Sequence, residues 1–163
     1  MPIRYHYGEV DSQMTQAFPD GPAQCVIFRT GGTRQALPID VVREILVPGD
    51  LTPAPGSPPE VLGLTQVRGQ ALPVIDLAKR LGLAAAPIGP ERRLVVAAWE
   101  GQAVALLVDG VDEVTTVYPD DFEVVRVPGR GGCPVLKRGE SLVGWLEVSE
   151  LIQGGYEAGR AAA

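Results

Sequence analysis

Short apolar runs separated by glycine-containing turns form the hydrophobic pattern of this chain. The most regular stretch spans residues 63–83, where an apolar run leads through Arg68-Gly69-Gln70 into a second apolar run and a short helical pattern that ends near Gly82. Gly69 is the residue of this turn that tolerates a positive φ without strain. The stretch therefore predicts a strand, a tight turn, a second strand and a short helix.

Two residues refine this prediction. Pro73 lies inside the second apolar run. Because proline cannot donate to a β-ladder, we expect its strand to lie at a sheet edge or to present that position outward. Asp76 stands just before the helical pattern, where its carboxylate would accept from the first free amides. We interpret Asp76 as a helix cap and not as a catalytic group.

The rest of the chain continues the alternation of short strands and turns. Gly and Pro number 20 and 15 and are scattered, which is typical of many short strands. Residues 40–46 read equally as a strand or a helical turn, and residues 51–60 as a proline-rich loop. We predict further strands at 24–30, 35–39, 94–99, 103–108, 135–136 and 141–146, helical turns at 119–122 and 147–152, a glycine-rich loop at 128–133, a flexible N-terminal arm at 1–22 and a disordered tail at 154–163.

The two halves of the chain repeat one another. Residues 36–46 align with residues 105–115 at a shift of 69, which places Glu44 on Glu113. Arg68-Gly69 aligns with Arg138-Gly139 at a shift of 70, and Asp76 aligns with Glu147 at a shift of 71. Repeated order of this kind indicates two similar units, at about 36–83 and 94–152. Because so few strands are marginal alone, we expect the units to share an interface core.

Charge and composition exclude several classes of partner. The formal net charge of −6 argues against nucleic acid and against an anionic membrane surface as a partner. The N-terminal residues show no signal-peptide pattern, and the apolar runs are too short to span a bilayer. We therefore expect a soluble, cytoplasmic protein with no direct membrane insertion. The two cysteines, Cys25 and Cys133, form neither a disulfide framework nor a metal site.

Residues for catalysis are scarce. The only histidine, His6, lies in the predicted arm, so no Ser/His/Asp or Cys/His set is evident. We expect no enzyme activity, no cofactor and no metal. Glu44 and Arg68 lie at corresponding points of their hairpins and are candidates for an ion pair. Such a pair is either an ordinary surface contact or a charged element of a protein-binding surface.

The stretch GLTQVRGQALPVIDL at residues 63–77 resembles the signature of CheW-type chemotaxis coupling proteins. VVREIL at 41–46 and ALLVDGVDEV at 105–114 fall where that family has its other motifs, and the resemblance covers about residues 24–153. It implies a mainly β fold over residues 23–153, with two intertwined five-stranded SH3-like β-barrel subdomains and short helices. Gln66-Val67 replaces the usual Asn-Leu of the signature, and the second half is short between residues 122 and 142.

The resemblance also implies a function. CheW-type proteins are non-catalytic adaptors that couple the cytoplasmic tip of methyl-accepting chemoreceptors to a CheA-type histidine kinase in chemosensory arrays, of the chemotaxis or pilus type. The resemblance places receptor and kinase binding at Val42, Glu44, Gly63, Arg68 and Gly69, and a second kinase-binding surface at Gly110, Val111 and Val114. The alternatives are a CheW-like scaffold that serves other partners without a kinase, and a small enzyme or ligand-binding β-barrel.

Overall fold

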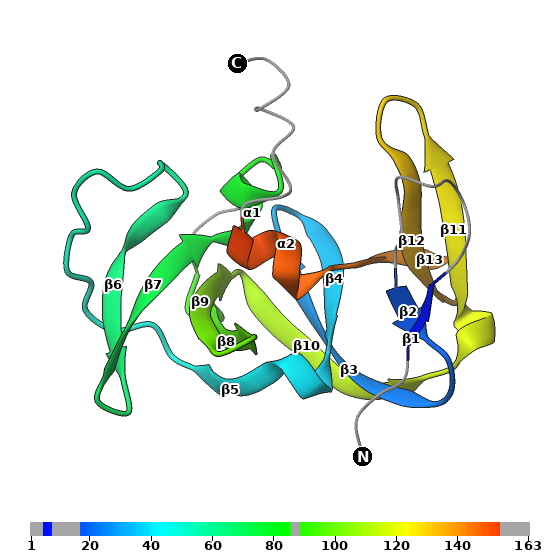
Figure 1. Ribbon diagram of the computed structural model, residues 1–163, viewed down its shortest axis with the longest axis horizontal. Helices are drawn as coiled ribbons and strands as arrows, with labels where there is room; N and C mark the ends of the chain where they lie inside the picture. The colour runs from blue at the N-terminus through cyan, green and yellow to red at the C-terminus, as the bar shows by residue number, and fades with distance from the viewer. Residues whose placement is uncertain (1–4, 8–16, 86–88, 154–163) are drawn as a thin grey trace.

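The computed structural model describes residues 5–7, 17–85 and 89–153, and it is mainly β, as predicted (Figure 1). The predicted tail and most of the predicted arm lie outside the described residues. Within the arm, β1 (Tyr5–Tyr7) and β2 (Ala17–Pro19) pair as antiparallel strands. Phe18 of β2 stacks on Phe122, with the ring centroids 5.6 Å apart. This contact attaches β2 to the rest of the protein.

The first unit contains five strands and one short helix. Asp76 caps that helix, because its carboxylate accepts a hydrogen bond from the backbone N–H of Lys79 at 3.2 Å. The segment that read as strand or helical turn is both, a 3₁₀ turn followed by a strand. The elements are β3 (Ala23–Thr30), β4 (Thr33–Pro38), the 3₁₀ turn Ile39–Val41, β5 (Val42–Leu46), β6 (Val61–Val67), β7 (Gln70–Asp76) and α1 (Leu77–Arg80).

The second unit repeats this order and adds one strand. The predicted helical turns after residues 118 and 146 are both present. The elements are β8 (Arg93–Trp99), β9 (Gln102–Val108), β10 (Gly110–Val117), the 3₁₀ turn Pro119–Asp121, β11 (Phe122–Val127), β12 (Gly131–Arg138), β13 (Ser141–Trp145) and α2 (Val148–Gln153).

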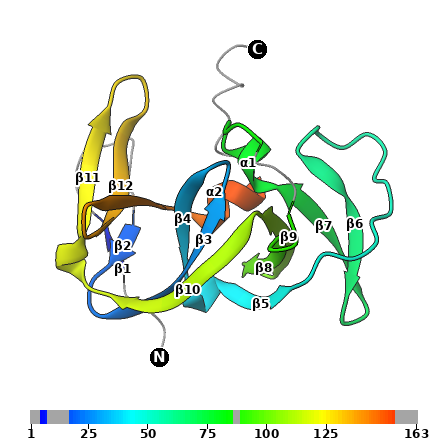
Figure 2. The ribbon, with the colours of Figure 1, turned by 180° about the vertical axis from the view of Figure 1, so that it is seen from behind.

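The two units exchange strands, so the predicted intertwining is confirmed. The five-stranded sheet has the order β5-β8-β9-β7-β6, and the six-stranded sheet has the order β10-β3-β4-β13-β12-β11. Each sheet therefore takes strands from both units. Seen from behind, β10 of the second unit runs beside β3 of the first (Figure 2). If β8 is matched with β3 and each later strand with its repeat, the five-stranded order reproduces the first five positions of the six-stranded order.

Details of register repeat as well. β5 pairs with β8 through an irregularity between Val42 and Glu44, and β10 pairs with β3 through one between Val111 and Glu113. Both sheets contain one parallel pair, β7 with β9 and β13 with β4. The strand orders are linear, so neither sheet closes through a continuous ladder. Each barrel is instead a strongly curled sheet with an open seam between its two outer strands.

Three buried clusters explain why the units need each other. One cluster lies inside each curled sheet, around Val96 and Leu107 in the five-stranded sheet and around Ile27 and Trp145 in the six-stranded sheet. The third lies between the sheets and joins both halves of the chain, as the predicted shared core requires. Its buried members are Val26, Phe28, Leu37, Ile75, Leu77, Val95, Ala97, Val104, Leu106, Val108, Leu146, Val148 and Leu151.

Pro73 fits the second of its two expected alternatives. β7 lies between β6 and β9, so Pro73 is not on an edge strand, but its position lies outside the ladder to β9. Pro73 faces Leu64 on β6, and the ladder to β9 begins only at Val74. The missing N–H of Pro73 therefore interrupts no ladder with β9. Residues 122–127, which the sequence pattern did not mark as a strand, form β11. The β11–β12 hairpin projects from the six-stranded sheet (Figure 1) and makes the second unit complete despite its short length.

Candidate functional site

Glu44 and Arg68 form the predicted ion pair. Arg68 Nε donates to Glu44 Oε2 at 2.8 Å, and Arg68 Nη2 donates to Glu44 Oε1 at 3.3 Å. The Arg68 side chain is 80% exposed and that of Glu44 is 21% exposed. The hydrogen bond from Arg68 to Glu44, with their charge attraction, raises the pKa of the guanidinium. The arginine therefore stays charged, held at one side and open to solvent on the other.

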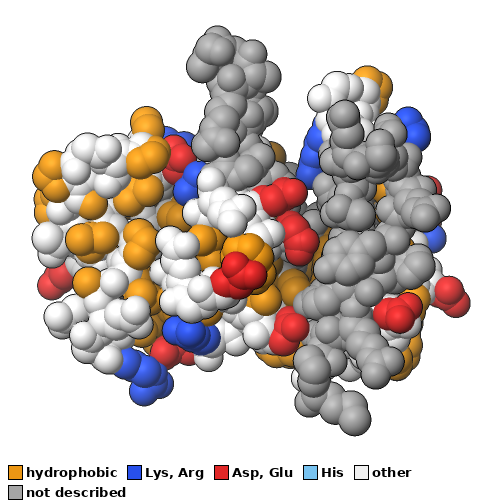
Figure 3. Space-filling model, in the orientation of Figure 1, with side chains coloured by type: hydrophobic (Ala, Val, Ile, Leu, Met, Phe, Trp, Pro, Cys, Tyr) orange, Lys and Arg blue, Asp and Glu red, His pale blue; other side chains and the backbone are white. Residues whose placement is uncertain are grey.

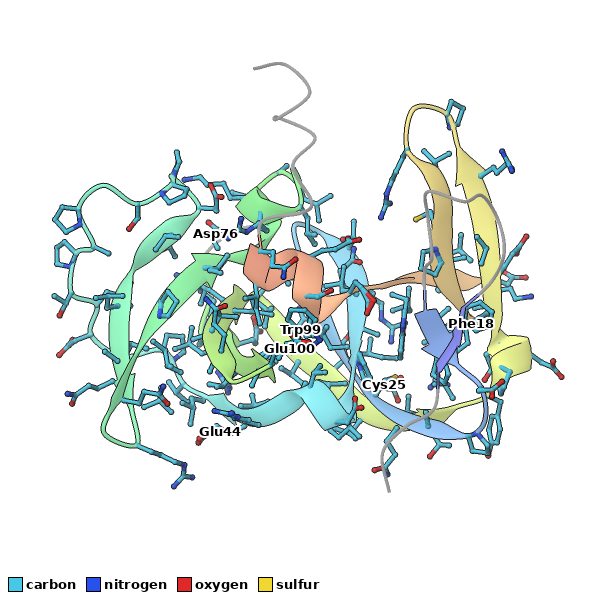
Figure 4. All side chains as sticks on the ribbon, viewed as in Figure 1. Phe18, Cys25, Glu44, Asp76, Trp99 and Glu100 are labelled. Atoms are coloured by element: carbon cyan, nitrogen blue, oxygen red, sulfur yellow. The ribbon has the colours of Figure 1, made fainter. Side chains whose placement is uncertain are left out.

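The pair bridges the open seam of the five-stranded sheet. Glu44 lies on the outer strand β5, and Arg68 directly follows β6, the other outer strand. Figure 4 shows Glu44 on β5 at the lower side of this sheet. No ladder joins β5 to β6, so the two side chains make the connection that backbone hydrogen bonds do not.

The backbone turn fixes where Arg68 points. Arg68 and Gly69 have φ angles of 50° and 78°, the pattern of a type I′ hairpin turn. We expected a positive φ for Gly69 alone, so the structure adds Arg68 to it. A non-glycine residue in this region is uncommon and carries a small strain. The turn therefore holds Arg68 at the tip of the hairpin, facing Glu44.

Gly63 serves the backbone and is not a contact residue. Its φ is 153°, and a Cβ there would lie 2.6 Å from the carbonyl oxygen of Thr52. Thr52 and Leu64 exchange backbone hydrogen bonds of 2.8 and 2.7 Å, which attach the proline-rich loop to β6. Only glycine allows this approach. Gly63 is buried and shapes the edge of the sheet from within.

Val42 is half-buried and packs against the core between the sheets. The more exposed apolar residues of this end are its neighbours Ile45, at 37%, and Val47, at 72%. On the face shown in Figure 3, hydrophobic side chains are visible over the β6–β7 side of the molecule. The structure thus brings Glu44 and Arg68 together and leaves Val42 and Gly63 as supports of the same edge.

The second predicted surface lies on β10, the outer strand of the six-stranded sheet. Val114 is 53% exposed, whereas Gly110 is buried and Val111 packs against the core between the sheets. A Cβ at Gly110 would overlap the guanidinium of Arg29, so a larger residue there would require the Arg29 side chain to move. Of these three residues only Val114 is placed to touch a partner.

Glu113 and Arg138 form a second ion pair, which was not predicted from the sequence. Arg138 Nη2 donates to Glu113 Oε1 at 3.0 Å. Glu113 is the repeat of Glu44, and Arg138 is the repeat of Arg68. The two alignments, at shifts of 69 and 70, contained the signal for this pair.

Three further charged residues surround the second pair. Arg29 Nε donates to Asp112 Oδ1 at 2.8 Å, and Arg34 Nε lies 3.3 Å from Asp112 Oδ2. Arg34 Nη2 also lies 3.6 Å from Glu113 Oε1. These contacts join β3, β4, β10 and β12 into one network. The first pair shares its partners with no other charged residue among those described.

Burial shifts the pKa of two groups away from these edges. Burial raises the pKa of the Cys25 thiol to about 11, so this thiol stays protonated and inert. Burial, with some repulsion from Glu150, raises the pKa of Glu147 to about 7. Glu147 immediately precedes α2, as Asp76 precedes α1 (Figure 4 labels Asp76).

In residues 5–7, 17–85 and 89–153, no group of three or more His, Cys, Asp or Glu side chains is placed to hold a metal ion. Over the same ranges, no helix is long and apolar enough to cross a membrane.

Comparison with known proteins identifies the family. The model of the CheW-like domain matches residues 24–155. Chemotaxis protein CheW of Rhizobium meliloti (strain 1021) is 36% identical over 104 residues, 64% of this chain and 67% of that protein. Protein FrzA of Myxococcus xanthus is 38% identical over 96 residues, 59% of each chain.

A solved structure agrees with this match. The crystal structure of scaffolding protein TtCheW from Thermoanaerobacter tengcongensis aligns with a TM-score of 0.69 at 25% identity, covering 77% of this chain and 89% of that one. The family match over residues 24–155 includes both ion pairs and all but the first residue of the two curled sheets. This chain therefore belongs to the CheW-like domain family.

Proposed function

We propose that this chain is a non-catalytic adaptor that couples chemoreceptors to a CheA-type histidine kinase in a bacterial chemosensory array. Its relatives include proteins named for chemotaxis and one described as a scaffolding protein. The single observation that carries the proposal is the Glu44–Arg68 pair, which lies on the exposed edge of a CheW-like fold. The proposed location is the cytoplasm, with membrane association only through the receptors.

The proposed contact residues divide by exposure. Arg68 and Gly69 are exposed at the tip of the β6–β7 hairpin, and Glu44 holds Arg68 in place. Val42 and Gly63 support this edge from within and act on binding through its shape. Arginine suits such a surface, because it combines apolar contact with directional hydrogen bonds. We assign the receptor tip and the kinase to this edge.

The second edge, on β10, is proposed to contact the kinase through Val114. Gly110 and Val111 shape that strand and are not proposed as direct contacts, because Gly110 is buried and Val111 is half-buried against the core. An exposed valine on an outer strand fits an apolar surface on a partner barrel. The adaptor would then contact the kinase at outer strands of both sheets and the receptor tip at the first edge alone.

Binding of purified wild-type protein to the regulatory domain of the histidine kinase from the same organism tests the proposal. We expect a complex, and we expect Arg68→Glu to weaken binding at least tenfold. Arg43→Glu is the matched control, since Arg43 is exposed on β5 and makes no ion pair within the described residues. Receptor binding without kinase binding would instead favour a scaffold that serves other partners.

A further inference from the structure

The two ion pairs occupy equivalent places in the two curled sheets. Glu44 and Glu113 each follow an irregularity in the pairing of an outer strand. Arg68 follows β6, and Arg138 is the last residue of β12, which is the repeat of β6. Each arginine thus contacts a carboxylate on an outer strand that makes no ladder with the strand the arginine ends or follows.

The residue after each carboxylate is an exposed apolar side chain. Ile45 follows Glu44 and is 37% exposed, and Val114 follows Glu113 and is 53% exposed. Successive residues of a strand point to opposite faces, so a carboxylate fixed on one face determines the direction of the next side chain. The ion pair and the apolar residue therefore form one unit on each edge.

The surroundings of the two pairs differ. Arg68 is 80% exposed, whereas Arg138 is 30% exposed and lies 3.5 Å from Thr115 Oγ1 as well as beside Glu113. Glu113 is also approached by Arg34, whose other neighbour, Asp112, holds Arg29. A single exposed pair is readily screened by salt, and a half-buried network is screened less.

We infer that Glu113 and Arg138 are positioning residues for the β10 docking edge, where they hold Val114 as Glu44 and Arg68 hold the first edge. The inference rests on the proposed function, because it assumes that a partner barrel docks on β10. It adds that the second edge is the more rigid one. It also assigns a role in binding to Arg138, a residue that does not itself touch the partner.

Arg138→Gln and Glu113→Gln test this assignment, with binding of the kinase regulatory domain as the measurement. We expect each variant to weaken binding about fivefold to tenfold. We expect the loss in the double variant to be smaller than the sum of the two single losses, because both changes break the contact between Glu113 and Arg138. Val114→Glu changes the contact surface without touching the network and should weaken binding at least as much. Leu142→Glu is the matched control, since Leu142 is 61% exposed and lies on β13, which makes no ladder with β10.

Hydrogen exchange separates positioning from a general loss of stability. Arg138→Gln should speed exchange of the β10 amides and leave the β5 amides unchanged, and Arg68→Gln should do the reverse. Raising the salt concentration should weaken the binding of Arg138→Gln, which relies on the first edge, more than it weakens the binding of Arg68→Gln.

The outcomes are distinguishable. If wild-type protein binds the regulatory domain and Val114→Glu does not, but Arg138→Gln binds normally, the positioning role is wrong and the proposed function stands. If Val114→Glu also binds normally, β10 is not a docking edge. If wild-type protein shows no binding, the proposed function fails and this inference fails with it.

Discussion

Arg68 and Glu44 are 24 residues apart in the chain, yet Arg68 Nε lies 2.8 Å from Glu44 Oε2 across the seam of the five-stranded sheet. The two outer strands of that sheet share no ladder, so the pair is the connection between them at this point. Its repeat joins Glu113 on the outer strand β10 to Arg138 at the end of β12, two strands that also share no ladder. The duplicated chain has thus kept both members of the pair in both copies.

The first prediction concerns reversal of the first ion pair. Glu44→Arg and Arg68→Glu should each weaken partner binding, and the double variant should regain part of it, because the exposed pair has no other charged partner to conflict with the exchange. Isothermal titration against the kinase regulatory domain measures this. The midpoint temperature of heat unfolding should change little, since exposed ion pairs contribute little to stability. No recovery in the double variant would show that Arg68 acts through its own contact with the partner and not through the pair.

The second prediction compares two glycines. Gly63→Ala should lower the free energy of unfolding by about 3 kcal/mol, because its methyl group would meet the Thr52 carbonyl. Gly69→Ala should lower the free energy of unfolding by about 1–2 kcal/mol. Its new Cβ would lie in open space, so the positive φ is the sole source of strain. Urea unfolding measures both values. Equal losses would mean that the attachment of the loop at Thr52 does not constrain Gly63.

The sequence predicted the fold well where the evidence was local. The turn at Gly69, the cap at Asp76 and the repeat all follow from residue types and spacing, and each has its counterpart in the structure. β11 was missed because Glu123 and Arg126 interrupt its apolar residues. The repeat in the first unit did not predict β11 either, because the segment that corresponds to β11 there is the proline-rich loop. That loop makes a single β-bridge to β6.

Pairings between distant segments were harder to predict. For Pro73 the sequence left open an edge strand or an outward-facing position, because the choice depends on the ladder that starts at Val74 with β9, a strand of the other unit. The exchange of strands came from the family resemblance and not from periodicity. The network around Glu113 depends on Arg29 and Arg34, whose repeats in the second unit, Ala98 and Ala103, are uncharged.

The third prediction concerns the shared core. Leu106→Ala should lower the free energy of unfolding by about 3 kcal/mol, because Leu106 is fully buried between the sheets. Leu142→Ala should stay within about 0.5 kcal/mol, because Leu142 is exposed. Urea unfolding followed by far-UV circular dichroism measures both.

The shared core also predicts that the units unfold together. Trp99 packs against the core between the sheets, and Trp145 lies in the cluster inside the six-stranded sheet. Fluorescence of Trp99→Phe and Trp145→Phe therefore reports on one region at a time. Within each variant, the fluorescence midpoint should coincide with the circular dichroism midpoint. Separate midpoints would show that the halves fold independently.

The fourth prediction concerns pH. Burial raises the pKa of Glu147 to about 7, above its usual value of 4.5. The folded protein therefore holds a proton there that the unfolded chain has lost, and stability falls as the pH rises from about 4.5 to about 7. At pH values above this window, Glu147→Gln should raise the free energy of unfolding by about 1 kcal/mol, after allowance for the partly exposed side chain. It should have little effect below the window. Heat unfolding across this range measures the difference, and a benefit that is the same at every pH would argue against titration of Glu147 as its cause.

The most direct test of the account is the affinity of the histidine kinase regulatory domain for three proteins: wild type, Arg68→Glu and Arg43→Glu. The account predicts a measurable complex for wild type and Arg43→Glu, and binding at least tenfold weaker for Arg68→Glu. Equal affinity for all three proteins, with all three folded by circular dichroism, would contradict it.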